Sequence, residues 1–425
     1  MRKAVFGLIG AAAGFTLMIG ASELRVVPTN ADAKTVAPAK QFRALALFDV
    51  AFEWVRAGYV EKPNDTKLVE SAINGMLAGL EDSYYLNAAA ANRLTACGAT
   101  NCGGIGIKFT IVDGLPKIVT PIDDSPASKA GLMAGDIITA LDNSSAEGLT
   151  SYEVTQRLAG NVGTTLRMEI ARPGQDRLIV IPLVRDNITP RSVRSRVDGG
   201  DVGYIRIAQF NEATADQLKK AVGDIAAQVA PDKLKGYIID LRDNPGGVAP
   251  DAAVAAVNAF LADGDVGSIR GRKSDDNKSF HAHGSDVSKG KKIAVLINGG
   301  TSSLAEVVAG ALKDNHRATL IGTRSFGEGS VATTIQLGPG KGVLHLAIGH
   351  YVTPSGSVIE GKGISPDVEA PQDVPADLKT DNKPSGSKSD DASAEDSKQP
   401  PLQSYIPPDV SADKALTVAY DLLRK

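Results

Sequence analysis

Three consecutive hydroxyl residues, Thr301, Ser302 and Ser303, are the first candidates for chemistry in this sequence. They follow an apolar run at 293–297 that predicts a fully buried strand, and they precede a helical pattern that begins at Leu304. The first N–H groups of a helix have no intrahelical partner, so a serine at this turn would have free N–H groups beside it. A serine nucleophile with an oxyanion hole needs that arrangement. The alternative is that these hydroxyls only cap the helix.

A second turn offers further backbone N–H groups. The predicted strand at 237–241 runs directly into Arg242-Asp243-Asn244-Pro245-Gly246-Gly247. Open α/β sheets usually keep their sites at the carboxyl ends of the strands, where such a turn lies. Strands alternate with helices over the surrounding sequence, which predicts a layered α/β core.

A glycine-rich segment, Gly104-Ile105-Gly106-Ile107, precedes a run of short strands and two short helices. Strands are predicted at 118–122, 136–141, 165–171 and 178–183, and helices at 125–132 and 150–158. This order resembles a PDZ domain, whose carboxylate-binding loop the glycine segment matches. Consecutive N–H groups in such a loop can bind the terminal carboxylate of a peptide, and the adjacent strand edge can pair with its tail. We expect Ile107 to help form the pocket for the last residue, the alternative being a structural turn.

The order of motifs from about residue 40 to about residue 370 resembles the C-terminal processing peptidases, also called tail-specific proteases. The segments that carry the resemblance are the PDZ-like region and residues 241–247, 298–306, 323–331, 353–356 and 361–367. Members of that family are serine endopeptidases with a Ser-Lys dyad supported by a Gln, and their PDZ domain recognises substrate C-termini. The resemblance therefore implies unstructured protein C-termini as partners.

The resemblance assigns the nucleophile to Ser303, three residues before Glu306. It assigns the oxyanion donors to the N–H of Leu304 and to the Gly246-Gly247 turn. Each of these residues follows a predicted strand of the α/β core, so the family pattern and the local reading of the turns agree.

Two of the three catalytic side chains are replaced: Glu328 stands where the family has lysine, and Ala332 where it has glutamine. General-base assistance is worth about 10²- to 10⁴-fold in rate. An ionised carboxylate about 4 to 5 Å from the oxyanion would oppose it by roughly 3 to 4 kcal/mol. We therefore expect proteolysis to be weak or lost. The alternative is an active serine endopeptidase that uses Ser303 with an altered base, either Glu328 or His350, since a histidine near the serine would restore a Ser-His arrangement.

Whole-chain properties narrow the function further. The chain has 425 residues, 43% of them hydrophobic, and a net charge of −3, which favours neither nucleic acid nor an acidic membrane surface as a partner. Met1-Arg2-Lys3 and the apolar run 4–21 predict an export signal or an anchor in the cytoplasmic membrane. The expected location is the periplasm or the cell exterior.

Cys97 and Cys102 are the only cysteines, and in an oxidising compartment their short spacing predicts a disulfide. A metal site there would need two further ligands that the neighbouring sequence lacks. The sequence predicts no cofactor and no metal.

The predicted fold class is α+β multidomain, with a PDZ domain inserted before an α/β layered protease core and helical segments at both ends. The expected parts are a signal peptide or membrane anchor (1–33), an N-terminal helical region (34–100), the PDZ domain (101–187), the protease core (188–370), a disordered linker (371–405) and a C-terminal helix (406–425). The terminal helices could pack on the body of the chain or form the surface of a homo-oligomer.

Overall fold

In a computed structural model, the structure describes residues 38–373 and 402–425, apart from positions 81, 100–102, 174, 176, 190, 248, 249, 403 and 408. The described residues form two compact units, one from residues 96–331, 348–373 and 402–425 and the other from residues 38–95 and 332–347. The predicted export segment, most of the predicted linker and the side chains of the predicted disulfide lie outside the described residues. Among the helices that are described, none is both long and apolar enough to cross a membrane.

The smaller unit contains α1 (Pro38–Gly58), α2 (Asp65–Leu77), β1 (Tyr84–Leu86) and the start of α3 (Ala88–Ala99). Asn64 caps α2 by accepting a hydrogen bond from the Lys67 N–H at 3.0 Å. The sequence predicted helices alone in this region, whereas β1 is a strand that pairs with residues 343–345. Three residues are too few to show a strand period, and the partner lies far along the chain. Leu47 and Trp54 on α1 are each 73% exposed, so the described residues leave this apolar face uncovered.

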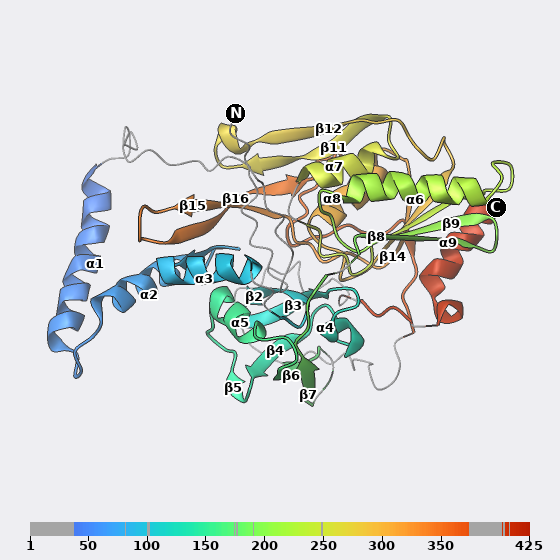
Figure 1. Cartoon of the computed structure of the whole chain (residues 1–425). Helices are drawn as coiled ribbons and strands as arrows, with labels where there is room; N and C mark the ends of the chain where they lie inside the picture. The colour runs from blue at the N-terminus through green and yellow to red at the C-terminus, as the bar shows by residue number, and fades with distance from the viewer. Residues whose placement is uncertain are drawn as a thin grey trace, which may run out of the picture. The chain divides into compact units, whose positions relative to one another are not determined.

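The PDZ-like region forms one antiparallel sheet in the order β2-β3-β4-β6-β7, with β5 paired to β4. Its elements are β2 (Ile107–Val112), β3 (Leu115–Pro121), α4 (Pro126–Lys129), β4 (Ile137–Leu141), β5 (Ser144–Ser145), α5 (Ser151–Leu158), β6 (Thr165–Ala171) and β7 (Ile179–Val184) (Figure 1). The predicted strands and both predicted helices are confirmed within a few residues. Ser125 caps α4 and Thr150 caps α5, as their positions before each helix indicate. Alternate residues of β6 are buried, because one face of this sheet covers the core of the region.

The protease-like core is a six-stranded sheet in the order β17-β14-β13-β10-β9-β8. The strands are β8 (Val193–Asp198), β9 (Val202–Ile207), β10 (Gly236–Asp240), β13 (Lys292–Ile297), β14 (Thr319–Gly322) and β17 (Val368–Glu369). All neighbouring pairs are parallel except β8 with β9. Every residue of β9 and β10 is buried, which explains why they are apolar apart from Arg206 and Asp240.

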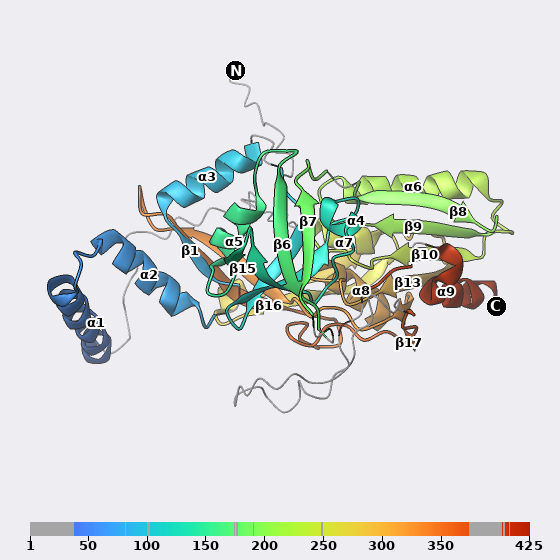
Figure 2. The same ribbon diagram turned by 90° about the horizontal axis from the view of Figure 1, so that it is seen from below.

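Helices cover both faces of this sheet. Three of them, α6 (Thr214–Gln228), α7 (Pro250–Asn258) and α8 (Leu304–Asp314), share one hydrophobic core with the strands. The C-terminal helix α9 (Lys414–Arg424) contributes Ala415, Leu416, Ala419 and Leu423 to a second core on the opposite face, after the 3-10 turn Val410–Ala412. Figure 2 shows β8, β9 and β10 between α6 and α9. The layered α/β core that the sequence predicted is confirmed.

A second sheet includes the hairpin of β11 (Asp263–Gly271) and β12 (Lys278–His283), joined through the 3-10 turn Ser274–Asp276. β11 also pairs with the end of β16 (Val343–Val352), which in turn pairs with β15 (Ser330–Gln336). β12 is the edge strand on this side of the sheet.

Candidate active site

Ser303 lies at the turn between β13 and α8, where the sequence placed the candidate nucleophile. Its backbone has φ 56° and ψ −124°, a region that a residue with a side chain rarely adopts. The preceding residues fix this conformation: the Thr301 hydroxyl donates to the Leu241 carbonyl at 2.8 Å, and the Ser302 N–H donates to the Asn244 carbonyl at 2.9 Å. The strained turn leaves Ser303 partly exposed while both of its hydroxyl neighbours are buried.

The glycine turn after β10 packs directly against Ser303. A Cβ added at Gly246 would lie 2.8 Å from both the Ser303 Cβ and the Leu304 nitrogen, so only glycine fits there. The buried Asn244 organises this turn, because its side-chain oxygen accepts from the Gly246 N–H at 2.8 Å. The Gly246 N–H thus already has a partner. Of the three predicted oxyanion donors, the N–H groups of Gly247 and Leu304 are therefore the better candidates.

A pair of hydrogen bonds joins the two turns. The Asp243 N–H donates to Asn298 Oδ1, and Asn298 Nδ2 donates to Asp243 Oδ1, both at 2.9 Å. Burial raises the pKa of Asp243 to about 7. This pairing holds the glycine turn after β10 in register with the serine turn after β13.

Glu306 connects Ser303 to the loop that contains Glu328. One oxygen of its fully buried carboxyl accepts from the N–H groups of Ser303 and Glu328, both at 2.9 Å. The other accepts from the Ser325 hydroxyl at 2.5 Å and the Gly327 N–H at 2.7 Å. Burial raises the pKa of Glu306 to about 7, although these hydrogen bonds oppose the shift. Ser303 and Glu328 are consequently held around one carboxyl group; the Ser-x-x-Glu spacing of a capping box could have indicated the contact with Ser303 but not the one with Glu328.

Lys108 brings a positive charge from the PDZ-like region to the same place. Its Nζ lies 2.7 Å from Glu328 Oε2 and donates to the Pro245 carbonyl at 2.9 Å, one residue before Gly246. The two charged side chains are only 26% and 22% exposed. No local pattern in the sequence indicates this contact, since Lys108 is on β2 in another region. The predicted opposition of Glu328 to an oxyanion treated the carboxylate as unpaired, and the ammonium of Lys108 offsets part of it.

The remaining predicted residues lie less centrally. Ala332 is on β15, in the smaller unit. His350 is on β16 opposite Arg270, and the N–H of the next residue, Tyr351, donates to the Gly329 carbonyl at 2.7 Å. Burial and then the charge of Glu328 raise the pKa of the Tyr351 phenol. Successive side chains alternate across a strand, so His350 points to the face of β16 opposite that of Tyr351, and its role as a base stays a prediction.

The predicted peptide-binding loop is a turn before β2. The Gly104 N–H donates to the Asp186 carbonyl at 2.9 Å, whereas no described residue accepts a hydrogen bond from the N–H of Ile105 or Gly106. Gly106 has φ 76°, and a Cβ there would lie 2.2 Å from the Ser125 Cβ. Ile107 is 1% exposed and packs in the PDZ-like core, so its side chain supports the loop from inside.

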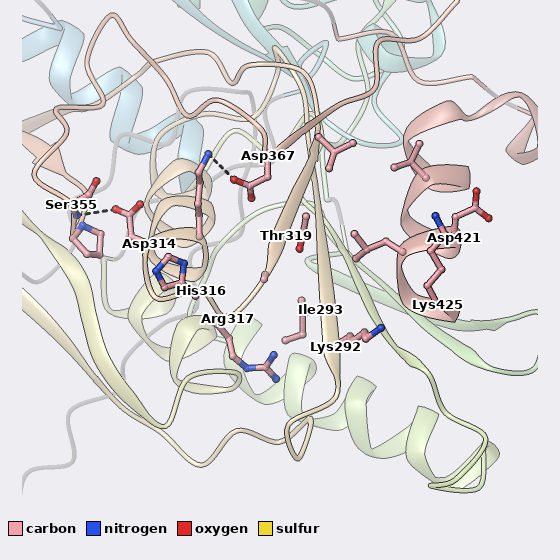
Figure 3. Close-up of a pocket in the computed structure, with 16 residues that line it drawn as sticks. Lys292, Ile293, Asp314, His316, Arg317, Thr319, Ser355, Asp367, Asp421 and Lys425 are labelled. Carbon is pink, nitrogen blue, oxygen red and sulfur yellow. Dashed lines mark hydrogen bonds and ion pairs between the residues drawn. The ribbon is translucent and has the colours of Figure 1, made fainter.

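A cavity of about 1340 Å³ lies at the amino ends of the core strands, opposite the end where Ser303 lies (Figure 3). It is lined by residues at the amino ends of β13 and β14, among them Lys292 and Thr319, whereas Ser303 follows the carboxyl end of β13. Its charges are partly paired, with Lys313 Nζ 3.0 Å from Asp367 Oδ1. None of the candidate catalytic residues lines this cavity, so the cavity is not part of the serine site.

Comparisons with known proteins agree with this architecture. Residues 201–370 match the model for peptidase family S41, residues 103–183 match a PDZ domain, and residues 8–89 match the N-terminal domain of the activating protease CtpB. A carboxy-terminal-processing protease of Bartonella bacilliformis is 41% identical over 100% of this chain and 96% of its own length. The carboxy-terminal processing protease CtpB of Bacillus subtilis is 30% identical over 87% of this chain and 76% of its own length. Among solved structures, the photosystem II D1 C-terminal processing protease is similar with a TM-score of 0.65 and 27% identity, covering 76% of this chain and 92% of that one.

Proposed function

The chain belongs to peptidase family S41, as a serine protease homologue of the C-terminal processing type with a PDZ domain, and we propose that it binds peptide C-termini but cleaves them weakly or not at all. The peptide would enter as an unstructured tail, with its terminal carboxylate in the loop before β2. Export from the cytoplasm is part of the proposal, motivated by the charged and apolar start of the sequence.

The observation that carries the proposal is the position of Glu328. Its N–H and that of Ser303 share one oxygen of Glu306, so a carboxylate side chain starts beside the nucleophile where the family has an amine. A neutral amine can take the proton of the serine hydroxyl and then stabilise negative charge as an ammonium. An ionised carboxylate that takes this proton becomes neutral and offers no positive charge, and a carboxylate that stays ionised opposes the oxyanion.

Peptide binding is supported by the loop before β2. The N–H groups of Ile105 and Gly106 are unused by the described residues, and both residues are buried. Buried N–H groups are normally hydrogen-bonded, so a ligand with acceptor oxygens fits this loop.

The decisive experiment compares the wild-type chain with the double variant Glu328→Lys, Ala332→Gln on an unstructured substrate with a free C-terminus. We expect little cleavage by the wild type, and a rise of about 10²-fold or more in the variant, which regains a general base. Ser303→Ala in the double-variant background must remove the gain. A fluorophosphonate probe that labels serine nucleophiles gives a second readout. A folded double variant that neither cleaves nor labels would refute an intact serine site.

A second candidate function is that of an active endopeptidase with an altered base, and the contact of Lys108 with Glu328 favours it. In that case Lys108 would supply the positive charge that the replaced lysine no longer provides. Wild-type cleavage that disappears in both Ser303→Ala and Lys108→Gln would support this candidate against the first. His350→Ala tests the other predicted base, and loss of cleavage in that variant would show that His350 takes the serine proton.

A further inference from the structure

Two histidines and two aspartates face one another on the hairpin of β11 and β12. Asp263 pairs with His283 and Asp265 pairs with His281 in the antiparallel register. Residues two apart on a strand, and residues paired across two strands, point to the same face. All four side chains therefore lie on one face of the hairpin. The hairpin belongs to a different sheet from β13, the strand that precedes Ser303.

The contacts within this group orient the His281 ring. Its Nδ1 lies 2.8 Å from Asp265 Oδ1, and its Nε2 lies 3.1 Å from Asp263 Oδ1. The rings of His281 and His283 are neighbours, with centroids 4.8 Å apart. One ligand atom from each of Asp263, His281 and His283 lies within 4.8 Å of the other two. Small rotations of three exposed side chains would bring these atoms around one ion.

The backbone under these side chains is anchored to the core. Asn315, at the end of α8, donates from Nδ2 to the Asp265 carbonyl at 2.7 Å. On the other strand, the His283 N–H donates to Asn258 Oδ1 at 3.0 Å. Both strands are thus fixed to helices of the protease-like core, and binding an ion would order only the side chains.

We propose that this hairpin is a binding site for a divalent transition-metal ion, with Zn²⁺ as its best match. The ligands are His281 Nε2, one ring nitrogen of His283 and a carboxylate oxygen of Asp263. Asp265 is a positioning residue: it accepts the Nδ1 proton of His281 and so presents Nε2 to the ion. A carboxylate behind a metal-binding histidine is the usual arrangement around zinc, and it fixes the tautomer of the ring.

The residue types decide which ion fits. Imidazole nitrogens suit zinc, copper and nickel, whereas calcium and magnesium require oxygen ligands. Two nitrogens and one carboxylate oxygen leave one position of a tetrahedral zinc ion for water. The His281, Asp263 and Asp265 side chains are 42%, 82% and 72% exposed, so the ion can enter from solvent without opening the fold.

The test uses the full exported chain without an affinity tag, stripped with a chelator and titrated with ZnCl₂ by calorimetry. We expect about one equivalent to bind, and Co²⁺ at the same site to give the visible absorption of a nitrogen- and oxygen-ligated ion. The pair His281→Gln with His283→Gln should abolish this binding. Asp265→Asn should weaken it by about 10- to 100-fold, the usual effect of losing the carboxylate behind a ligand histidine.

The matched control is His316→Gln, at the end of α8 and outside the hairpin, which should leave zinc binding unchanged. All of the substituted side chains on the hairpin are exposed, so circular dichroism should report the same fold for every variant. Zinc binding that survives the double histidine substitution would overturn the site, as would the absence of binding by the folded wild-type chain. An Asp265→Asn variant with unchanged affinity would overturn the role of Asp265.

Discussion

The contact between Lys108 and Glu328 makes a specific prediction about the pH dependence of a repaired site. At present Lys108 Nζ lies 2.7 Å from the carboxylate of Glu328, and the two charges attract. The double variant Glu328→Lys, Ala332→Gln replaces this attraction by a repulsion between two amines. A neighbouring positive charge lowers the pKa of an amine. The introduced lysine must be neutral to act as a base, so Lys108 should extend activity to lower pH.

The size of this effect follows from the geometry. Two unit charges about 4 Å apart interact by about 4 kcal/mol at an effective dielectric constant of about 20. The side chains at these positions are 26% and 22% exposed, and Lys108 can turn toward solvent, so we reduce the interaction to about 1.5 to 3 kcal/mol. One pH unit corresponds to about 1.4 kcal/mol, which gives a shift of about one to two pH units.

The assay is the pH profile of kcat/KM for a tailed peptide, measured for the double variant with and without Lys108→Gln. The ascending limb should lie about one to two pH units lower when Lys108 is present. Ser303→Ala in both backgrounds controls for contaminating proteases. Coincident profiles would refute the proximity of Lys108 to position 328. A shift in the other direction would show that Lys108 acts on the reaction other than by its charge.

Three further predictions concern the rest of the chain. The pKa of Glu306 is raised to about 7, so its contribution to the free energy of unfolding, about 3 kcal/mol, is present below about pH 4.5 and is lost as the pH rises through 7. Urea unfolding should show a fall in stability from pH 5 to pH 8 that is smaller in Glu306→Gln than in the wild type. An equal fall in both proteins would contradict the burial argument. Gly106→Ala forces a Cβ to within 2.2 Å of the Ser125 Cβ and should abolish binding of a peptide with a free C-terminus in fluorescence anisotropy, as amidating that peptide should in the wild type. Mass spectrometry of exported protein should find Cys97 and Cys102 bonded, and two free thiols would disprove the disulfide.

The sequence predicted the elements well because their signals are local. The caps at Ser125 and Thr150, the apolar strand before the serine turn and the helix after it can each be identified within a window of about ten residues. The family resemblance allowed whole domains to be predicted from these local signals, since the motifs occur in the same order as in the family. The strand β1 was missed because three residues show no period and its partner is distant in sequence.

The contacts that decide the chemistry could not be predicted in the same way. Lys108 reaches Glu328 only after two domains have packed, and Asp263 meets His281 and His283 only through the register of a hairpin. The sequence predicted no metal site, and it singled out neither of these histidines. A charged residue gives no local sign of its partner, because the partner can come from any element that the fold brings near.

The pairing of Lys108 with Glu328 also bears on how the change at position 328 can be tolerated. A carboxylate that is only 22% exposed beside a serine turn and a buried glutamic acid would be destabilising if it had no counter-charge. Lys108 provides that charge and also donates to the Pro245 carbonyl, next to the glycine that packs on Ser303. A positive charge on the PDZ strand therefore lies beside Glu328, and the packing of the two domains contributes to the surroundings of Ser303. Glu328→Gln should therefore lower the free energy of unfolding in urea, because Lys108 loses its counter-charge. Asp224→Asn, which removes the same charge from the exposed pair with Lys220, should change that free energy by less than about 1 kcal/mol.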